Sequence, residues 1–98
     1  MLPLGRDHLR DALNQLRDWS GDAREIRRTL RLDDSEHADL TERIKIVADA
    51  LQLRPDVRRL DGWTQIRLSS PDGNALTQSE VTLAARIDAA CRAVMAHR

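Results

Sequence analysis

The chain has 98 residues, and its 16 basic and 16 acidic side chains give a formal net charge of +0 at pH 7. This balance argues against a general nucleic-acid binder, because such proteins gain affinity by neutralising phosphates. This length allows one domain, residues 1–98, with a single modest core, and a chain that exposes so much surface often gains from oligomerising. Because no apolar run approaches the roughly 20 residues of a membrane span, and the N-terminus is charged too early for a signal peptide, we expect a cytosolic (cytoplasmic) protein with no membrane segment.

The first third of the chain predicts a helix followed by two strands. The helix covers 6–18, where apolar residues recur at helical spacing: Leu9, Ala12, Leu13 and Leu16. After the turn signal Gly21-Asp22, the alternation of a strand places Ile26, Leu30 and Leu32 on one face, with Arg28 among them. Trp19 is placed to begin a partner strand before this turn.

A second helix is predicted over 35–53. Asp33 and Asp34 precede it, and capping of the helix explains them better than a metal site does. One apolar stripe contains Leu40, Ile44, Val47, Ala48 and Leu51, and a second contains Ile46, Ala50 and Leu53. The two stripes fit either a helix buried on two sides or a helix shared between the core and an oligomer interface. We expect the second stripe to form that interface, in a homodimer or larger assembly.

A β-hairpin is predicted around Asp61-Gly62, among the strongest two-residue turn signals. This turn sets the cross-strand pairs Leu60–Trp63, Arg59–Thr64, Arg58–Gln65 and Val57–Ile66. Opposed residues share a face of the sheet, so the core face should carry Val57, Ile66 and Leu68.

The other face of the predicted sheet is rich in arginine. It should carry Arg27, Arg31, Arg58, Trp63 and Arg67, together with Leu60 and Gln65, with Glu25 as its only acid. Such a face is either simply solvated or a partner-binding surface, and tryptophan beside arginine is the mixture enriched at interface hot spots. We expect it to bind an acidic protein surface with marked salt dependence.

The last helix is predicted to begin near Leu76, with Thr77 and Glu80 as a capping box. Its buried stripe contains Val81, Ala84, Ile87, Cys91, Val94 and Met95. Cys91 is the single cysteine of the chain, which excludes an internal disulfide, and its place on the stripe predicts a buried thiol rather than a reactive one. The expected fold is therefore α+β, in the order α-ββ-α-ββ-α, with a four-stranded antiparallel sheet and helices packed on one face.

Several phrases in this order resemble the pterin-4a-carbinolamine dehydratase family. "LRDW" resembles the family's entry into its first strand, "ADALQLRPDV" its helix end with a His-His-Pro phrase, "LSSPDGNALT" its Thr-His loop, and "LAARID" its last helix. The family removes water from a carbinolamine and uses three histidines for this reaction. The resemblance places Leu53, Arg54 and Pro71 at the three histidine positions of this chain.

None of these three residues can exchange a proton near neutral pH as histidine does. The remaining histidines, His8, His37 and His97, match no site position and are expected to lie on the surface. We therefore expect no catalytic residue, no metal and no cofactor. Arg54 fits either a contact with a pterin ring carbonyl or the negative end of the preceding helix dipole.

Two functions from different classes follow. The first is a non-enzymatic binding module, because one branch of dehydratase-like proteins that lack the histidines accompanies α-carboxysome genes of autotrophic bacteria as a RuBisCO assembly factor. The partner would then be a RuBisCO subunit or assembly intermediate, and the protein would act as a chaperone. The alternative is a divergent pterin-4a-carbinolamine dehydratase or pterin-binding protein. We expect the first, and so a protein that is not an enzyme.

Overall fold

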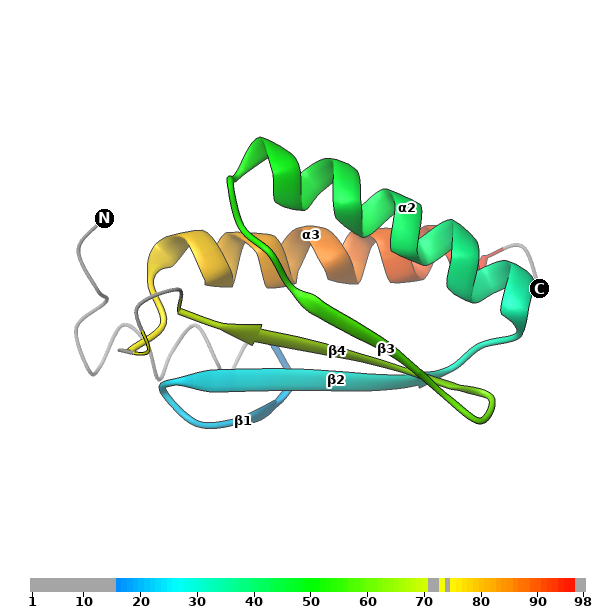
Figure 1. Ribbon diagram of the computed structural model, residues 1–98, viewed down its shortest axis with the longest axis horizontal. Helices are drawn as coiled ribbons and strands as arrows, with labels where there is room; N and C mark the ends of the chain where they lie inside the picture. Colours follow the sequence, from blue (N-terminus) through cyan, green and yellow to red (C-terminus); the bar gives the residue numbers. More distant parts are fainter. Residues whose placement is uncertain (1–15, 71–72, 74, 97–98) are drawn as a thin grey trace.

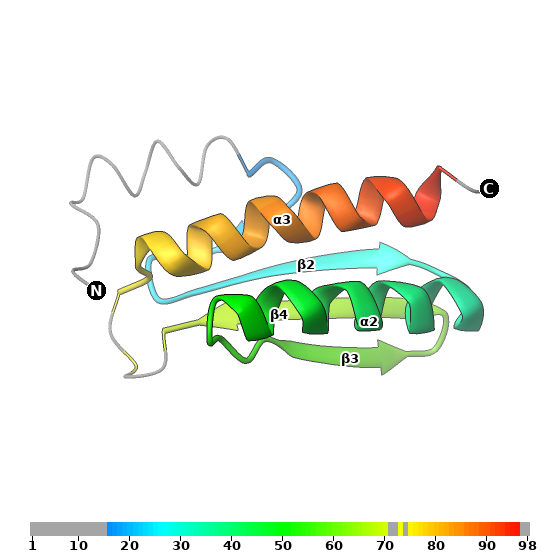
Figure 2. The same ribbon diagram turned by 90° about the horizontal axis from the view of Figure 1, so that it is seen from above.

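Two helices cover one face of a four-stranded antiparallel sheet in the computed structural model, which describes residues 16–70, 73 and 75–96 (Figure 1). The elements are β1 (Ser20–Gly21), β2 (Glu25–Arg31), α2 (Asp34–Ala50), β3 (Asp56–Leu60), β4 (Trp63–Ser69) and α3 (Gln78–Met95). The strand order is β1-β2-β4-β3. Seen from above, α2 and α3 lie side by side over the sheet (Figure 2). The α+β class and the four-stranded antiparallel sheet are confirmed, while most of the helix predicted over 6–18 lies outside the described residues.

The hairpin formed by β3 and β4 confirms the predicted register in full. Asp61 and Gly62 both have positive φ angles, 49° and 90°, which is the backbone of a type I′ turn. Leu60 pairs with Trp63 and Val57 with Ile66. Ile66 and Leu68 are buried under the helices, as predicted.

The buried face of β2 carries an arginine between two aliphatic residues. Ile26 and Leu30 are buried as predicted, and Arg28 is buried with them. The Arg28 guanidinium lies 2.6 Å from Asp88 Oδ1 on α3, and the Trp19 indole donates to the same oxygen at 2.8 Å. A buried cation is tolerated when it is paired and hydrogen-bonded in this way.

Helix α2 begins as predicted but ends three residues earlier. Asp33 caps its start, and Asp33 and Glu36 exchange the two hydrogen bonds of a capping box. The predicted end at Leu53 is wrong, because the helix stops at Ala50. Beyond it the Gln52 and Leu53 amides donate back to Asp49 O and Ala48 O at 3.1 and 2.9 Å, the pattern of a Schellman motif.

Helix α3 begins after Thr77, but the predicted capping box does not form there. Thr77 has the extended backbone of an N-cap, yet its side chain caps no amide. Its hydroxyl instead donates to Glu80 Oε2. Four residues of the predicted stripe are buried as expected: Ala84, Ile87, Cys91 and Val94. Two others, Val81 and Met95, are only half-buried. The buried face of α3 also contains Leu83 and Glu80, which the predicted stripe omitted.

No helix in the described part of the chain is long and apolar enough to cross a membrane.

Candidate functional site

A cavity of about 290 Å³ opens where α2 ends and α3 begins. Both helix ends lie at the same end of the two-helix layer (Figures 1 and 2). The turn after α2 provides half of the lining: Gln52, Leu53, Arg54 and Pro55. The other half comes from the end of β4, with Leu68 and Ser69, and from the first turns of α3, with Glu80 and Leu83. The cavity is thus built from segments that are separated in sequence, and packing of the helices on the sheet brings them together.

Glu80 is the polar group that distinguishes this cavity. Its side chain is 2% exposed, and Oε2 accepts a hydrogen bond from Thr77. The other oxygen, Oε1, is buried and has no hydrogen-bond partner among the described residues. Buried polar atoms without a partner cost free energy and are rare in folded proteins, so one at a cavity wall suggests a ligand that completes it.

The turn after α2 holds its part of the wall in a constrained backbone. Gln52 has a φ of 56°, in the left-handed region that glycine usually occupies after a helix. Outliers of this kind cost about 1–3 kcal/mol and are frequent at binding sites. Pro55 then limits the backbone on the other side of Arg54. The two restraints fix where Leu53 and Arg54 meet the cavity.

The structure brings two of the three family histidine positions to this cavity. Leu53 and Arg54 line it, while Pro71 lies outside the described residues, as do His8 and His97. His37 is on the first turn of α2, about 20 Å along the helix from the cavity. Its Nδ1 lies 2.8 Å from the hydroxyl of the buried Thr64. No group of three or more metal-ligating side chains occurs in the described residues.

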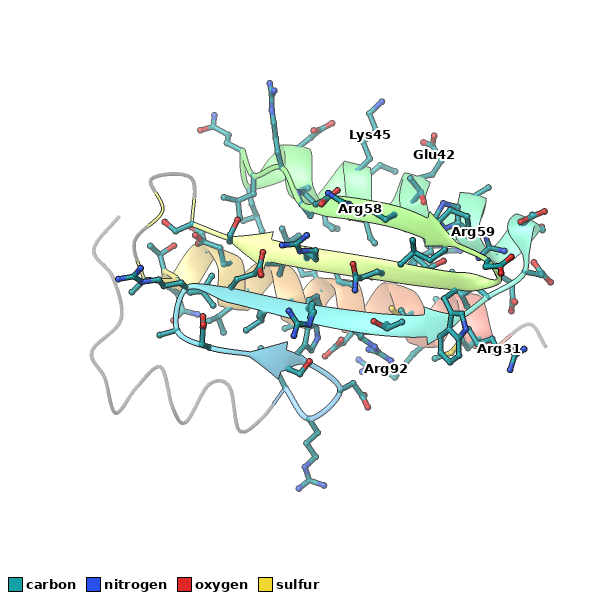
Figure 3. The ribbon with its side chains drawn as sticks, turned by 60° about the horizontal axis from the view of Figure 1, so that its bottom comes forward. Arg31, Glu42, Lys45, Arg58, Arg59 and Arg92 are labelled. Carbon is teal, nitrogen blue, oxygen red and sulfur yellow. The ribbon has the colours of Figure 1, made fainter. Side chains whose placement is uncertain are left out.

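The arginine-rich sheet face is present, but its charge balance differs from the prediction. Arg27, Arg31 and Arg58 are exposed, and Arg67 is half-buried; Figure 3 turns this face toward the reader and labels Arg31 and Arg58. Glu25 is not its only acid. Asp56 also lies on it and pairs with Arg58 at 3.0 Å, while Glu25 pairs with Arg67 at 2.6 Å. The prediction missed Asp56, because it placed the start of β3 at Val57.

An aromatic group remains exposed at the hairpin end of this face. Trp63 is 42% exposed and Leu60, its cross-strand partner, 47%. The Arg31 guanidinium lies 5.6 Å from the centre of the Trp63 ring, within the range of a cation–π contact.

The proposed interface stripe of α2 is divided by the early end of the helix. Ile46 is 67% exposed and Ala50 is also exposed. Leu53 lies beyond the helix and packs, half-buried, against the core of its own chain. The outward apolar surface of α2 is therefore smaller than the sequence suggested.

The burial of Glu80 is the feature of the site that the sequence prediction missed. A Thr-x-x-Glu phrase before an apolar run is the usual signature of a capping box, and this one was interpreted so. The distinguishing signal was available: Glu80 stands one turn before Ala84 and two turns before Ile87, on the stripe that faces the core.

Comparisons with known proteins agree on one family. A family model described as "Pterin 4 alpha carbinolamine dehydratase" matches residues 2–90. A curated protein of Sulfurisphaera tokodaii, named "Putative pterin-4-alpha-carbinolamine dehydratase", is 27% identical over 89 residues, which are 90% of this chain and 96% of that protein. The crystal structure of a "transcriptional coactivator/pterin dehydratase" from Brucella melitensis has a TM-score of 0.80 at 20% identity and covers 92% of this chain and 99% of its own. This last similarity supports the fold.

Proposed function

The chain belongs to the pterin 4 alpha carbinolamine dehydratase family, and from that premise we propose that it dehydrates a pterin 4a-carbinolamine in the cavity between the α2–β3 turn and the start of α3. The expectation that the protein is not an enzyme is wrong, since the matching family and the Sulfurisphaera tokodaii relative both carry the name of an enzyme. What carries the proposal is the buried carboxyl group of Glu80, a residue of the cavity wall, whose Oε1 has no hydrogen-bond partner among residues 16–70, 73 and 75–96.

The reaction needs proton transfer but no change of oxidation state. The carbinol C–O bond breaks, the neighbouring nitrogen loses its proton, a C=N bond forms, and the hydroxyl leaves with a proton as water. One group that accepts the N–H proton and supplies a proton to the leaving hydroxyl therefore suffices for the balance. A carboxyl group can do both, and a positioned acid–base group typically contributes about 10²–10⁴-fold in rate.

Glu80 is the residue of the cavity wall with this capacity. Leucine and proline have no titratable group, and a guanidinium does not serve as a general base. Thr77 orients the Glu80 carboxyl by donating to Oε2, which leaves Oε1 for the substrate. The apolar side chains of Leu53, Leu68 and Leu83 suit the faces of a flat ring.

A dehydratase assay with purified protein tests this function. We expect the wild type to accelerate loss of the carbinolamine over the uncatalysed rate, and Glu80→Gln to lower kcat by about 100-fold or more. Glu42→Gln is the matched control, because Glu42 is exposed on α2 and the chemical change is the same. It should retain the wild-type rate within about twofold.

Two results would overturn the proposal. One is a wild-type protein that leaves the uncatalysed rate unchanged. The other is a folded Glu80→Gln variant, checked by circular dichroism, that turns over as fast as the wild type.

As a second function we propose protein binding through the open sheet face, defined by Arg27, Arg31, Arg58, Trp63 and Arg67. What favours it is the exposed Trp63 ring stacked with Arg31 and bordered by Leu60. An acidic partner would suit this face. The RuBisCO assembly role expected from the sequence, with a RuBisCO subunit or intermediate as partner, is one version of this proposal. The family description and the two relatives named above speak of pterin dehydratases and of a transcriptional coactivator, not of RuBisCO.

Charge reversal of the open face tests this second function. We expect the triple change of Arg27, Arg58 and Arg67 to Glu to abolish any gain in assembled RuBisCO when the chain is co-expressed with the RuBisCO subunits. The control reverses Arg43, Arg86 and Arg92, which lie on the helices. Equal yields from wild type and the folded triple variant would remove the open face as the binding site.

A further inference from the structure

Arg54 is held at the mouth of the cavity. Arg54 is exposed to solvent and is also one of the residues that line the cavity. The backbone on either side is restrained, by the Leu53 amide bonded to Ala48 O and by the ring of Pro55. The guanidinium therefore projects from a fixed point rather than from a mobile loop.

Arg54 differs from three arginines of the following strands, because no acidic side chain among the described residues forms an ion pair with it. Arg58 pairs with Asp56, Arg59 with Asp34, and Arg67 with Glu25. Within residues 16–70, 73 and 75–96, the Arg54 side chain has no ion pair or hydrogen bond. Glu80 is the one acid among the described residues of the cavity wall, and it is buried. Among the described residues that line the cavity, the charge exposed to solvent is therefore the Arg54 cation.

The size of the cavity decides which part of a ligand meets this charge. About 290 Å³ is at the small end of small-molecule sites. A bicyclic pterin fits within such a volume, and a ring substituent that extends toward the open side would meet Arg54. Guanidinium groups bind carboxylate and phosphate oxygens through forked hydrogen bonds.

We propose that this site selects pterins whose ring substituent carries an anionic group, a carboxylate or a phosphate, and that Arg54 is the residue that selects them. The inference rests on the proposed function, because it assumes that the cavity takes a pterin. Arg54 also lies just beyond α2, whose last turn has no basic residue. A role limited to the helix dipole would change stability but would not distinguish one pterin from another.

Fluorescence titration with three stable pterins tests the proposal: 6-hydroxymethylpterin, which is neutral at its substituent, 6-carboxypterin, and the phosphate ester of 6-hydroxymethylpterin. At neutral pH we expect the wild type to bind at least one anionic probe about tenfold more tightly than the neutral one. The two anionic arms show which group is preferred. Arg54→Gln should remove the preference, so that its affinities for the three probes agree within about twofold.

Arg92→Gln is the matched control, because Arg92 is exposed and lies about 18 Å along α3 from Glu80. It should keep the preference. Equal wild-type affinities for all three probes would overturn the inference while leaving the proposed function standing, and so would an Arg54→Gln variant that keeps the preference or loses all three probes equally. Failure of every probe to bind the wild type would overturn the inference and the pterin site together.

Discussion

Arg28 shows how a single charged residue can occupy a core position of a strand. Its guanidinium and the Trp19 indole both donate to Asp88 Oδ1, so this one carboxylate pairs with a group from β2 and with a group from the residue before β1. We expect Asp88→Ala to lower the free energy of unfolding by about 3 kcal/mol, because it leaves a buried cation without its main partner. Urea denaturation measures this loss.

The double change Arg28→Met and Asp88→Leu separates the cost of an orphaned charge from that of lost packing. It should recover at least half of the stability lost in Asp88→Ala, since no buried charge remains. A double variant as unstable as Asp88→Ala would show that the ion pair itself stabilises the fold.

Cys91 makes stability depend on pH in the alkaline range. Burial raises the pKa of its thiol above the ordinary value of 9.0, because desolvation disfavours the thiolate. The folded state therefore keeps its proton where the unfolded state loses it. This contribution is fully present below pH 9.0 and is lost as pH rises toward the folded pKa.

We expect the wild type to lose stability as the pH rises above 9.0, and Cys91→Ala to show a shallower loss over the same interval. Thermal unfolding at a series of pH values measures both slopes. Parallel slopes in the two proteins would contradict the assignment to Cys91.

At the scale of the element, the turn after α2 combines a helix end with a cavity wall. Gln52 adopts a left-handed backbone that costs an L side chain about 1–2 kcal/mol. Gln52→Gly should therefore raise the free energy of unfolding by about 0.5–1 kcal/mol. Gln65→Gly, the same change inside β4, should lower it by a similar amount. Chemical denaturation of both variants checks the pair of signs, and destabilisation by Gln52→Gly would show that the side chain itself is needed.

The sequence predicted the elements best where one local signal decides the backbone. Asp61-Gly62 requires two positive φ angles, and this alone fixes the strand register of the hairpin. The end of α2 was missed because Gln52 carries no glycine signal, and the hydrogen bonds from Gln52 and Leu53 that stop the helix are invisible in composition. The Thr-x-x-Glu phrase does mark the start of α3, but it does not show that Glu80 is buried, because the burial of Glu80 depends on how α3 packs on the sheet.

The site was predicted only in part for the same reason. The positions of Leu53 and Arg54 at the cavity follow from collinear phrases of the chain. The absence of the three histidines led to the expectation of no catalytic residue, because the sequence alone does not show that Glu80, an acid on another helix, lines the same cavity as Leu53 and Arg54. Asp56 was missed on the open sheet face because strand ends are the least certain part of a pattern.

For the whole molecule, the expectation of a homodimer or larger assembly stays a prediction. The outward side of α2 presents Ile46 and Ala50 to solvent, and exposed apolar surface of this kind often marks an interface. We expect light scattering at micromolar concentration to give at least twice the chain mass of 11.1 kDa, and Ile46→Glu to reduce the mass to that of a monomer. Lys45→Glu, at the adjacent exposed position labelled in Figure 3, should leave the assembly intact. A monomeric wild type would contradict the prediction.

The central claim is that this protein binds its pterin in the cavity between the C-terminal end of α2 and the N-terminal end of α3. Amide chemical-shift mapping by NMR, with 6-hydroxymethylpterin titrated into the labelled wild type, tests it most directly. The account predicts that the largest shifts fall on Gln52, Leu53, Ser69 and Glu80, while Arg27 and Trp63 on the open sheet face stay unchanged. Shifts concentrated on the open sheet face, or no shifts at saturating pterin, would contradict it.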